Sequence, residues 1–87
     1  MTANLKIANA GNVIVPAVLT LRRKGYVVTC KRKSEHDELW IAEGSVGRFS
    51  ADDPVALLGV VTIGEVRGED WRASDEEIER FQKEYDY

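Results

Sequence analysis

The sequence has little of the chemistry that disulfides, metal sites and nucleophilic catalysis need. Its 87 residues include one cysteine, Cys30, and one histidine, His36. One cysteine excludes an internal disulfide, and a structural zinc site takes several Cys or His ligands. An unpaired thiol is typical of a reducing compartment. We therefore expect no metal and no cofactor, and we predict a cytoplasmic location.

Long apolar runs and targeting signals are also missing. The longest apolar run, Val55 to Ile63, contains Gly59 and Thr62 and is about half the roughly 20 residues that a membrane-spanning helix needs. Residues 1–6 lack the basic start and apolar core of a secretory signal. These features predict a soluble protein that does not associate with membranes.

Proline and glycine are few, at two and seven residues, while 44% of the chain is hydrophobic and 31% is charged. This composition excludes disorder, collagen-like repeats and low complexity. A chain of this length buries about 60–65% of its unfolded surface. We therefore predict a single domain spanning residues 1–87.

The net charge of −3 hides an asymmetry between the two halves. Residues 1–50 carry eight basic and four acidic side chains, whereas residues 51–87 carry four basic and eleven acidic ones. Either the two halves attract separate partners, or they neutralise each other after folding. Mutual compensation on a solvated surface is the simpler explanation.

The first half of the chain predicts a helix followed by a three-stranded meander. Asn12 is the expected N-cap of a helix that carries Pro16 in its first turn and ends in three cations before Gly25. From Tyr26 the apolar period changes to two, which indicates strands. The later strands are expected at residues 39–43 and 46–51. Residues 5–8 fit either a short helical turn or an edge strand.

The hairpins of this meander have predicted registers. A three-residue turn at residues 34–36 would place Cys30 opposite Trp40. A two-residue turn at Gly44 and Ser45, with glycine first, would place Trp40 opposite Phe49 on the same face. The inner face then consists of Tyr26, Val28, Cys30, Trp40, Ala42 and Phe49.

The second half predicts two helices. Asp53 and Pro54 form a cap and first-turn pair for a helix that ends at Arg67. The β-branched run 60–63 leaves a strand as the alternative there. Residues 74–77 form a capping box for a last helix. The predicted fold is α+β, in the order α-β-β-β-α-α, with the helices on one face of the sheet.

The helix predicted over residues 54–67 is apolar on all sides down to Gly64, except for Thr62. Such a helix must be covered all round. We expect it to lie at the centre of the core. The alternative is an exposed strip that forms a homodimer or partner surface, with Gly59 and Gly64 permitting close approach.

Catalytic motifs are weak. Cys30 and His36 are the only nucleophile and base of the usual kind, and we interpret them as a buried small side chain and a solvated loop residue. The adjacent carboxylates fit helix caps better than an acid–base pair. No glycine-rich phosphate loop is present. We therefore expect that the protein is not an enzyme.

Two binding functions fit the charges. The first is a non-catalytic inhibitor, similar in general character to bacterial immunity proteins and antitoxins, that presents an acidic surface to a protein partner. Trp71 is its candidate aromatic anchor, although a tryptophan there also suits the turn between the last two helices. The candidate contact residues are Asp52, Asp53, Glu69, Asp70, Trp71, Glu76 and Glu79.

The second function is nucleic-acid binding through a basic cluster. Its candidate residues are Arg22, Arg23, Lys24, Lys31, Arg32, Lys33 and Arg48. Over residues 12–67 the predicted topology resembles that of double-stranded-RNA-binding domains. That family has a lysine-rich start to the helix after the sheet, whereas residues 51–54 here are Ala-Asp-Asp-Pro. The two aspartates would repel phosphate.

Overall fold

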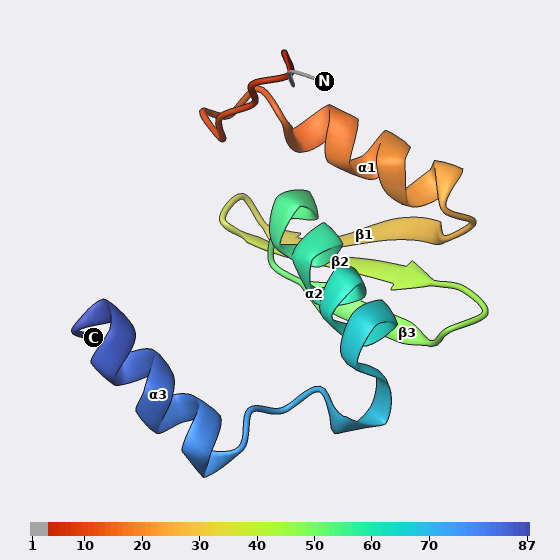
Figure 1. The fold of residues 1–87 in the computed structure, drawn as a ribbon. Coiled ribbons are helices and arrows are strands. Elements are labelled where there is room, and N and C mark those ends of the chain that lie inside the picture. The colour runs from red at the N-terminus through yellow and green to blue at the C-terminus, as the bar shows by residue number, and fades with distance from the viewer. Residues whose placement is uncertain (1–3) are drawn as a thin grey trace.

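The α-β-β-β-α-α order predicted from the sequence is confirmed. The computed structural model describes residues 4–87. Its elements are α1 (Ile14–Arg23), β1 (Val27–Ser34), β2 (Asp37–Glu43), β3 (Arg48–Ala51), α2 (Pro54–Arg67), the 3-10 turn η1 (Gly68–Asp70) and α3 (Asp75–Tyr85), with one antiparallel sheet in the order β1-β2-β3 (Figure 1). Residues 4–11 form neither helix nor strand, and residues 1–3 lie outside the described part.

The start of α1 differs from the prediction. The helix begins at Ile14, and Val13 occupies the cap position without a side-chain hydrogen bond. Asn12 is therefore not the N-cap. Its Oδ1 instead accepts a hydrogen bond from the backbone N–H of Ala10, at 3.3 Å. The side chain of Asn12 thus closes a local turn before the helix rather than the first turn of the helix.

The end of α1 follows the prediction. Gly25 has a φ of 97°, and its N–H donates to the carbonyl of Arg22 at 3.0 Å. The N–H of Tyr26 donates to the carbonyl of Leu21 at 3.1 Å. These two bonds form a Schellman motif, which needs a residue that tolerates a left-handed conformation. The motif reverses the chain and starts β1.

The first hairpin has the predicted register, with Cys30 opposite Trp40. Its turn is shorter than predicted. Ser34 pairs with Asp37, and the pairing is irregular between Arg32 and Ser34. The irregularity absorbs the extra residue in the strand, so only two residues remain in the turn.

The second hairpin is offset from its predicted register by two residues. Trp40 lies opposite Ala51, and Phe49 lies opposite Ala42. The connection runs over residues 44–47 and is closed by a 3.0 Å hydrogen bond from Gly44 N to Gly47 O. Because side chains alternate with a period of two, Trp40 and Phe49 still share a face, as predicted. Their direct pairing was wrong.

Gly44 does not take the turn conformation that was predicted for it. A two-residue turn with glycine first needs a positive φ at that glycine, and Gly44 is not among the positive-φ residues of the described chain. Gly44 instead lies against the ring of Tyr26. A Cβ built on Gly44 would lie 2.7 Å from Tyr26 Cδ1 and 2.8 Å from Cε1. A side chain at Gly44 would therefore collide with Tyr26, and the connection spans four residues instead of two.

A small core lies between the sheet and helices α1 and α2, which cover the same face (Figure 1). The ring of Phe49 meets that of Tyr26 edge to face, with 6.1 Å between centroids. The buried members of this cluster are Leu21, Tyr26, Ala42, Leu57 and Val61, and Val28, Trp40, Phe49, Ala51 and Leu58 pack against them half-buried.

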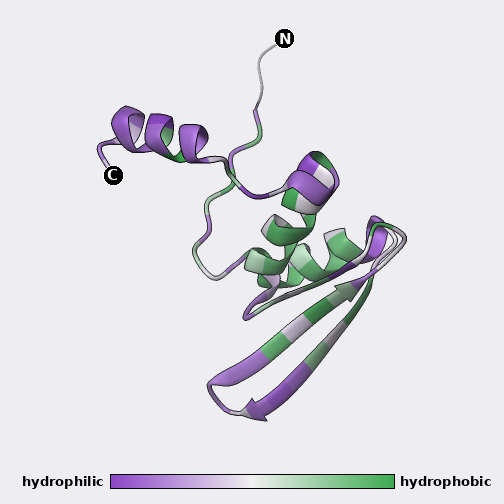
Figure 2. Ribbon diagram, turned by 90° about the horizontal axis from the view of Figure 1, so that it is seen from below, coloured by the Kyte–Doolittle hydropathy of each residue, from purple (hydrophilic) through white to green (hydrophobic). Residues whose placement is uncertain are grey.

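Cys30 was predicted to be buried on this face, and that prediction is wrong. Cys30 shares the face of Trp40, yet it is exposed. The first hairpin extends beyond the helices, and its far end is hydrophilic (Figure 2). The helices therefore do not cover the strand at this point.

Helix α2 has the predicted bounds. The Asp53 side chain accepts a hydrogen bond from the N–H of Ala56 at 2.8 Å, and Pro54 stands in the first turn. Residues 60–63 are helical, so the strand alternative is excluded. The cap and the proline therefore outweigh the β-branched run.

Helix α3 has the predicted capping box, in which Ser74 and Glu77 bond to each other's backbone N–H groups. Its position differs from the prediction. Both ribbon views show α3 standing away from the sheet and from α1 and α2 (Figures 1 and 2). None of its residues is buried. Only two of the three main helices therefore cover the inner face.

Glu65 joins the two packed helices to the start of the sheet. One carboxylate oxygen lies 2.9 Å from the ammonium of Lys24, and the other accepts a 2.9 Å hydrogen bond from the hydroxyl of Tyr26. Lys24, and after it Tyr26, lower the pKa of Glu65 below its ordinary value of 4.5. A carboxylate with a lowered pKa in the fold stabilises it above that value, and the contribution is lost as the pH falls.

We therefore expect Glu65→Gln to reduce the free energy of unfolding at neutral pH and to flatten its acid dependence. The difference from the wild type should shrink between about pH 5 and pH 3. Urea unfolding at each pH, followed by circular dichroism, measures this difference. Glu69→Gln, which alters an exposed carboxylate of η1, is the control. A difference that stays constant with pH would contradict the role of Glu65.

Candidate functional site

The acidic residues predicted to contact a partner do not form one surface. Asp52 and Asp53 precede α2, whereas Glu69 and Asp70 follow it. The 14 residues of α2 separate these pairs by about 20 Å, at 1.5 Å per residue. Asp53 is also the N-cap of α2. Two of the three acidic groups therefore lie at opposite ends of a helix.

The third acidic group lies on α3 and is not purely acidic. Glu76 and Glu79 share a shallow surface depression with Arg80 and Lys83. Carboxylates and cations three or four residues apart on a helix are neighbours. This face of α3 is therefore charged but mixed in sign, as is usual for a solvated helix.

The basic cluster is also divided. Three of its cations lie at the end of α1, three lie in the second half of β1, and one lies on β3. Lys24 is paired with Glu65, and Arg32 lies 2.7 Å from Glu38. The side chains of Lys31 and Arg32 point to opposite faces because they are adjacent in a strand. The cluster is thus less compact than the sequence indicates.

Cys30 and His36 do not form a nucleophile–base pair among the hydrogen bonds of residues 4–87. The Sγ of Cys30 lies 3.9 Å from Glu38 Oε2, while His36 is in the hairpin turn. Glu38 also accepts hydrogen bonds from Trp40 Nε1 and Arg32, and the bond from Trp40 is the largest cause of its lowered pKa. Glu38 therefore gathers Arg32, Trp40 and the Cys30 thiol around one carboxylate near the hairpin tip, and His36 is not bonded to the thiol.

Metal binding has no support in the part of the chain that the structure describes. No group of three or more His, Cys, Asp or Glu side chains there is arranged to hold an ion. Within residues 4–87, moreover, no helix combines the length and apolar character needed to cross a bilayer.

The clearest surface feature is an apolar groove beside α2, which the sequence did not place. Its volume is about 390 Å³. It opens between α2 and the edge strand β3, and Trp71 is among its lining residues. We call it the α2 groove; it is lined by Arg48, Phe49, Ser50, Val60, Ile63, Gly64 and Trp71.

The α2 groove exists because α2 is covered on one flank only. Helix α1 packs on one side of α2, and Glu65 carries the ionic contact between them. On the other flank, Val60 is 38% and Ile63 is 45% exposed. The prediction that α2 is covered all round is therefore wrong, and this flank presents an exposed apolar strip. Gly64 contacts Phe49 of the same chain.

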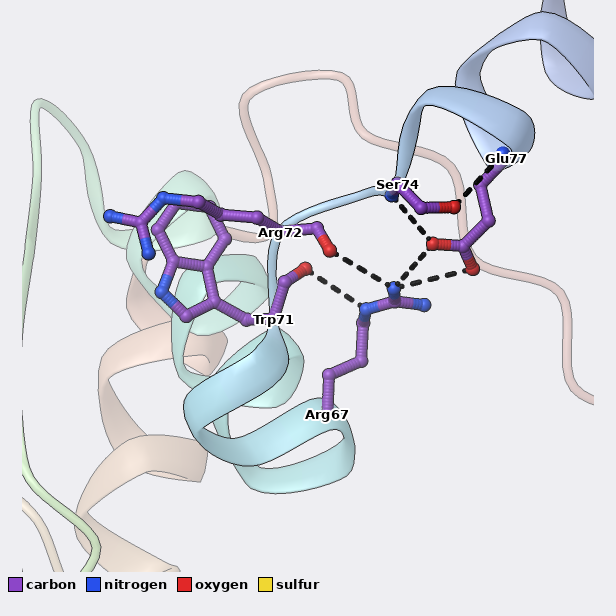
Figure 3. Close-up of polar contacts among 5 residues, drawn as sticks. All are labelled: Arg67, Trp71, Arg72, Ser74 and Glu77. Atoms are coloured by element: carbon purple, nitrogen blue, oxygen red, sulfur yellow. Dashed lines mark hydrogen bonds and ion pairs between the residues drawn. The ribbon is translucent and has the colours of Figure 1, made fainter.

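Arg67 determines how the chain leaves this groove (Figure 3). Its Nε donates to the carbonyl of Trp71 at 2.9 Å, and one Nη donates to the carbonyl of Arg72 at 3.4 Å. The same Nη lies 3.1 Å from Glu77 Oε1, which also accepts from the N–H of Ser74 at 2.9 Å. This network, the Arg67 clamp, fixes residues 71–77 and hence the direction of α3.

Trp71 was given two interpretations, as an aromatic anchor for a partner and as a residue that suits the turn between the last two helices. Its backbone carbonyl accepts the hydrogen bond from Arg67 Nε, and its indole borders the α2 groove. The indole is 48% exposed, and the guanidinium of Arg72 lies 4.4 Å from its ring centroid. The side chain is therefore accessible at the groove.

Helix α3 carries a second exposed apolar surface. Ile78, Phe81 and Tyr85 lie on one side of the helix, as their spacing predicts. They are 44%, 45% and 63% exposed. The ring of Phe81 lies 5.0 Å from that of Tyr85, centroid to centroid. We call these three residues the α3 apolar face.

Comparisons with protein-family models, with curated proteins and with solved structures find no match to this chain.

Proposed function

We propose that this protein is a non-catalytic module that binds another polypeptide through the α2 groove and the α3 apolar face. The observation that carries this proposal is that both surfaces are apolar and exposed at once, within one small chain. Monomeric proteins rarely leave large contiguous apolar patches in water, and such patches mark interaction sites. Aromatic side chains such as Trp71 and Phe81 are the residue types that contribute most at interfaces.

An apolar surface is better supported than an acidic one. The acidic candidates are divided between the two ends of α2 and a mixed face of α3. An inhibitor of the immunity or antitoxin type is one form of such a module. It would engage its target through the apolar residues, and Glu69 and Asp70 would lie at the rim beside Trp71. The exposed free thiol of Cys30 suits a cytoplasmic setting.

Affinity capture with matched variants tests this proposal. Wild type, Ile63→Glu and Leu19→Glu are immobilised and exposed to lysate of the source cells, and retained proteins are identified by mass spectrometry. Leu19 is 54% exposed on α1 and serves as the control. We expect a protein that wild type and Leu19→Glu retain and that Ile63→Glu loses. Retention of the same proteins by all three baits would contradict the proposal.

The same experiment addresses nucleic-acid binding. Retained nucleic acid is measured at low and high salt, because binding to phosphates weakens steeply as salt rises. A salt-sensitive signal lost in a variant with Lys31→Glu and Lys33→Glu, and kept in Ile63→Glu, would favour the basic cluster as the working surface instead.

A further inference from the structure

The open flank of α2 leaves room for one more helix on the sheet. Helix α1 lies along one flank of α2 above the sheet, and the opposite flank is vacant above β3. A helix placed there would cover Val60 and Ile63 and complete a layer of three helices. The layer that the structure shows contains two helices, α1 and α2.

Helix α3 has the length and the apolar face that a helix on this flank needs. It is 11 residues long and carries one apolar face. Isolated helices shorter than about 12–15 residues are marginal in water, so such a helix depends on packing. No buried residue anchors it to its own chain, and the Arg67 clamp directs it away from the sheet (Figure 3).

The size of the exposed surface indicates that packing is incomplete. The chain exposes 7425 Å², whereas a compact monomer of its mass exposes about 5,200 Å². The radius of gyration is 15.5 Å, compared with about 12 Å for a compact domain of this length. Part of this excess of about 2,200 Å² belongs to residues 4–12, which lie outside helices and strands and are almost all exposed, and the rest includes the open flank of α2 and helix α3.

The charges also suit a second copy of the same chain. Helix α3 contains five acidic and two basic side chains. The charged residue that lines the α2 groove is Arg48, and Arg72 lies over the Trp71 ring at the same place. The acidic helix would therefore meet Arg48 and Arg72 at the groove, while Glu69 borders the adjoining hollow beside Trp71.

We propose that two copies of this chain exchange their α3 helices, each placing its α3 apolar face in the α2 groove of the other. This proposal rests on the proposed function, and it identifies a second copy of the chain as the polypeptide that binds the α2 groove. A reciprocal exchange about a two-fold axis uses the same two surfaces on both copies and leaves neither exposed. In the described chain, the Arg67 clamp bonds the start of α3 to the end of α2, and α3 does not lie in its own groove.

Analytical ultracentrifugation under reducing conditions tests the exchange. Wild type is expected at twice the 9.8 kDa chain mass. Ile63→Glu, in the groove, and Phe81→Glu, on the arm, should each raise the dimer dissociation constant at least about tenfold. Neither residue belongs to the buried core cluster. Leu19→Glu should remain dimeric. If either variant loses its helical signal, Val60→Glu or Tyr85→Glu replaces it.

An equimolar mixture of Ile63→Glu and Phe81→Glu is the decisive sample. In an exchanged dimer the intact arm of the first variant meets the intact groove of the second, so the mixture should form more dimer than either variant forms alone. A monomeric wild type, or a mixture that recovers nothing, would overturn the exchange. If the wild type is monomeric and Ile63→Glu still loses a captured protein, the binding function stands and only the second copy is ruled out.

Discussion

Leu57→Ala should lower the free energy of unfolding by about 2–5 kcal/mol, the range found when a buried leucine is truncated in a rigid core. Leu57 is fully buried, and the whole buried cluster contains only five residues. Small domains have about 5–15 kcal/mol of stability in total. The loss is therefore a large part of the total stability, and the thermal midpoint of the variant should lie well below that of the wild type.

Val66→Ala is the matched control for this prediction. Val66 lies on the same helix but is 78% exposed, so its truncation should change stability by less than about 0.5 kcal/mol. Urea unfolding at one protein concentration, followed by far-ultraviolet circular dichroism, compares the two variants. Equal midpoints for Leu57→Ala and Val66→Ala would show that α2 does not form the core described here.

Gly44→Ala should lower the free energy of unfolding by about 1–3 kcal/mol, as overpacking does. The added methyl group would lie less than 3 Å from two ring atoms of Tyr26. The Tyr26 ring is buried, and its hydroxyl donates to Glu65 at 2.9 Å. It therefore has little freedom to move aside.

Gly47→Ala is the control for this prediction because it alters the same turn. A Cβ on Gly47 would meet Phe49 Cζ at 3.7 Å, an ordinary contact. Its effect on the thermal midpoint should be small. In a Tyr26→Val background the penalty of Gly44→Ala should largely disappear. A penalty of equal size in both backgrounds would assign the requirement for glycine to the backbone instead.

The parts of the fold that were predictable from the sequence are those with a local chemical cause. Helix starts are of this kind: Asp53 with Pro54, and Ser74 with Glu77, provide for backbone N–H groups within a few residues. Gly25 likewise ends its helix by reversing the chain locally. Such effects can be predicted from the sequence alone. The second hairpin was not predictable in this way. Gly44 reads as a turn glycine, but its role depends on Tyr26, which is distant in sequence.

The candidate site was predictable only in part. The sequence shows that residues 54–67 form an apolar helix, but it does not show which flank α1 covers. The direction of α3 depends on bonds from one guanidinium to two carbonyls and a carboxylate. The sequence contains only weak signals of this network. Arg67 stands four residues before Trp71 and ten before Glu77, and the capping box indicates that the Glu77 carboxylate accepts hydrogen bonds. Residue types alone predicted one acidic surface. In the fold, the length of α2 separates two of its acidic groups.

Strand β1 is an edge of the sheet. It is eight residues long and mostly exposed, so the backbone groups along its outer edge could pair with a strand from another molecule. Lys31, Arg32 and Lys33 occupy its distal half. Positive charge at an unpaired edge repels a second copy of the same edge and so suppresses stacking into fibrils. If two copies exchange helices as proposed, Lys31 and Lys33 at this edge would keep self-association to the helical contacts, because their charges oppose an extension of the sheet by a second copy.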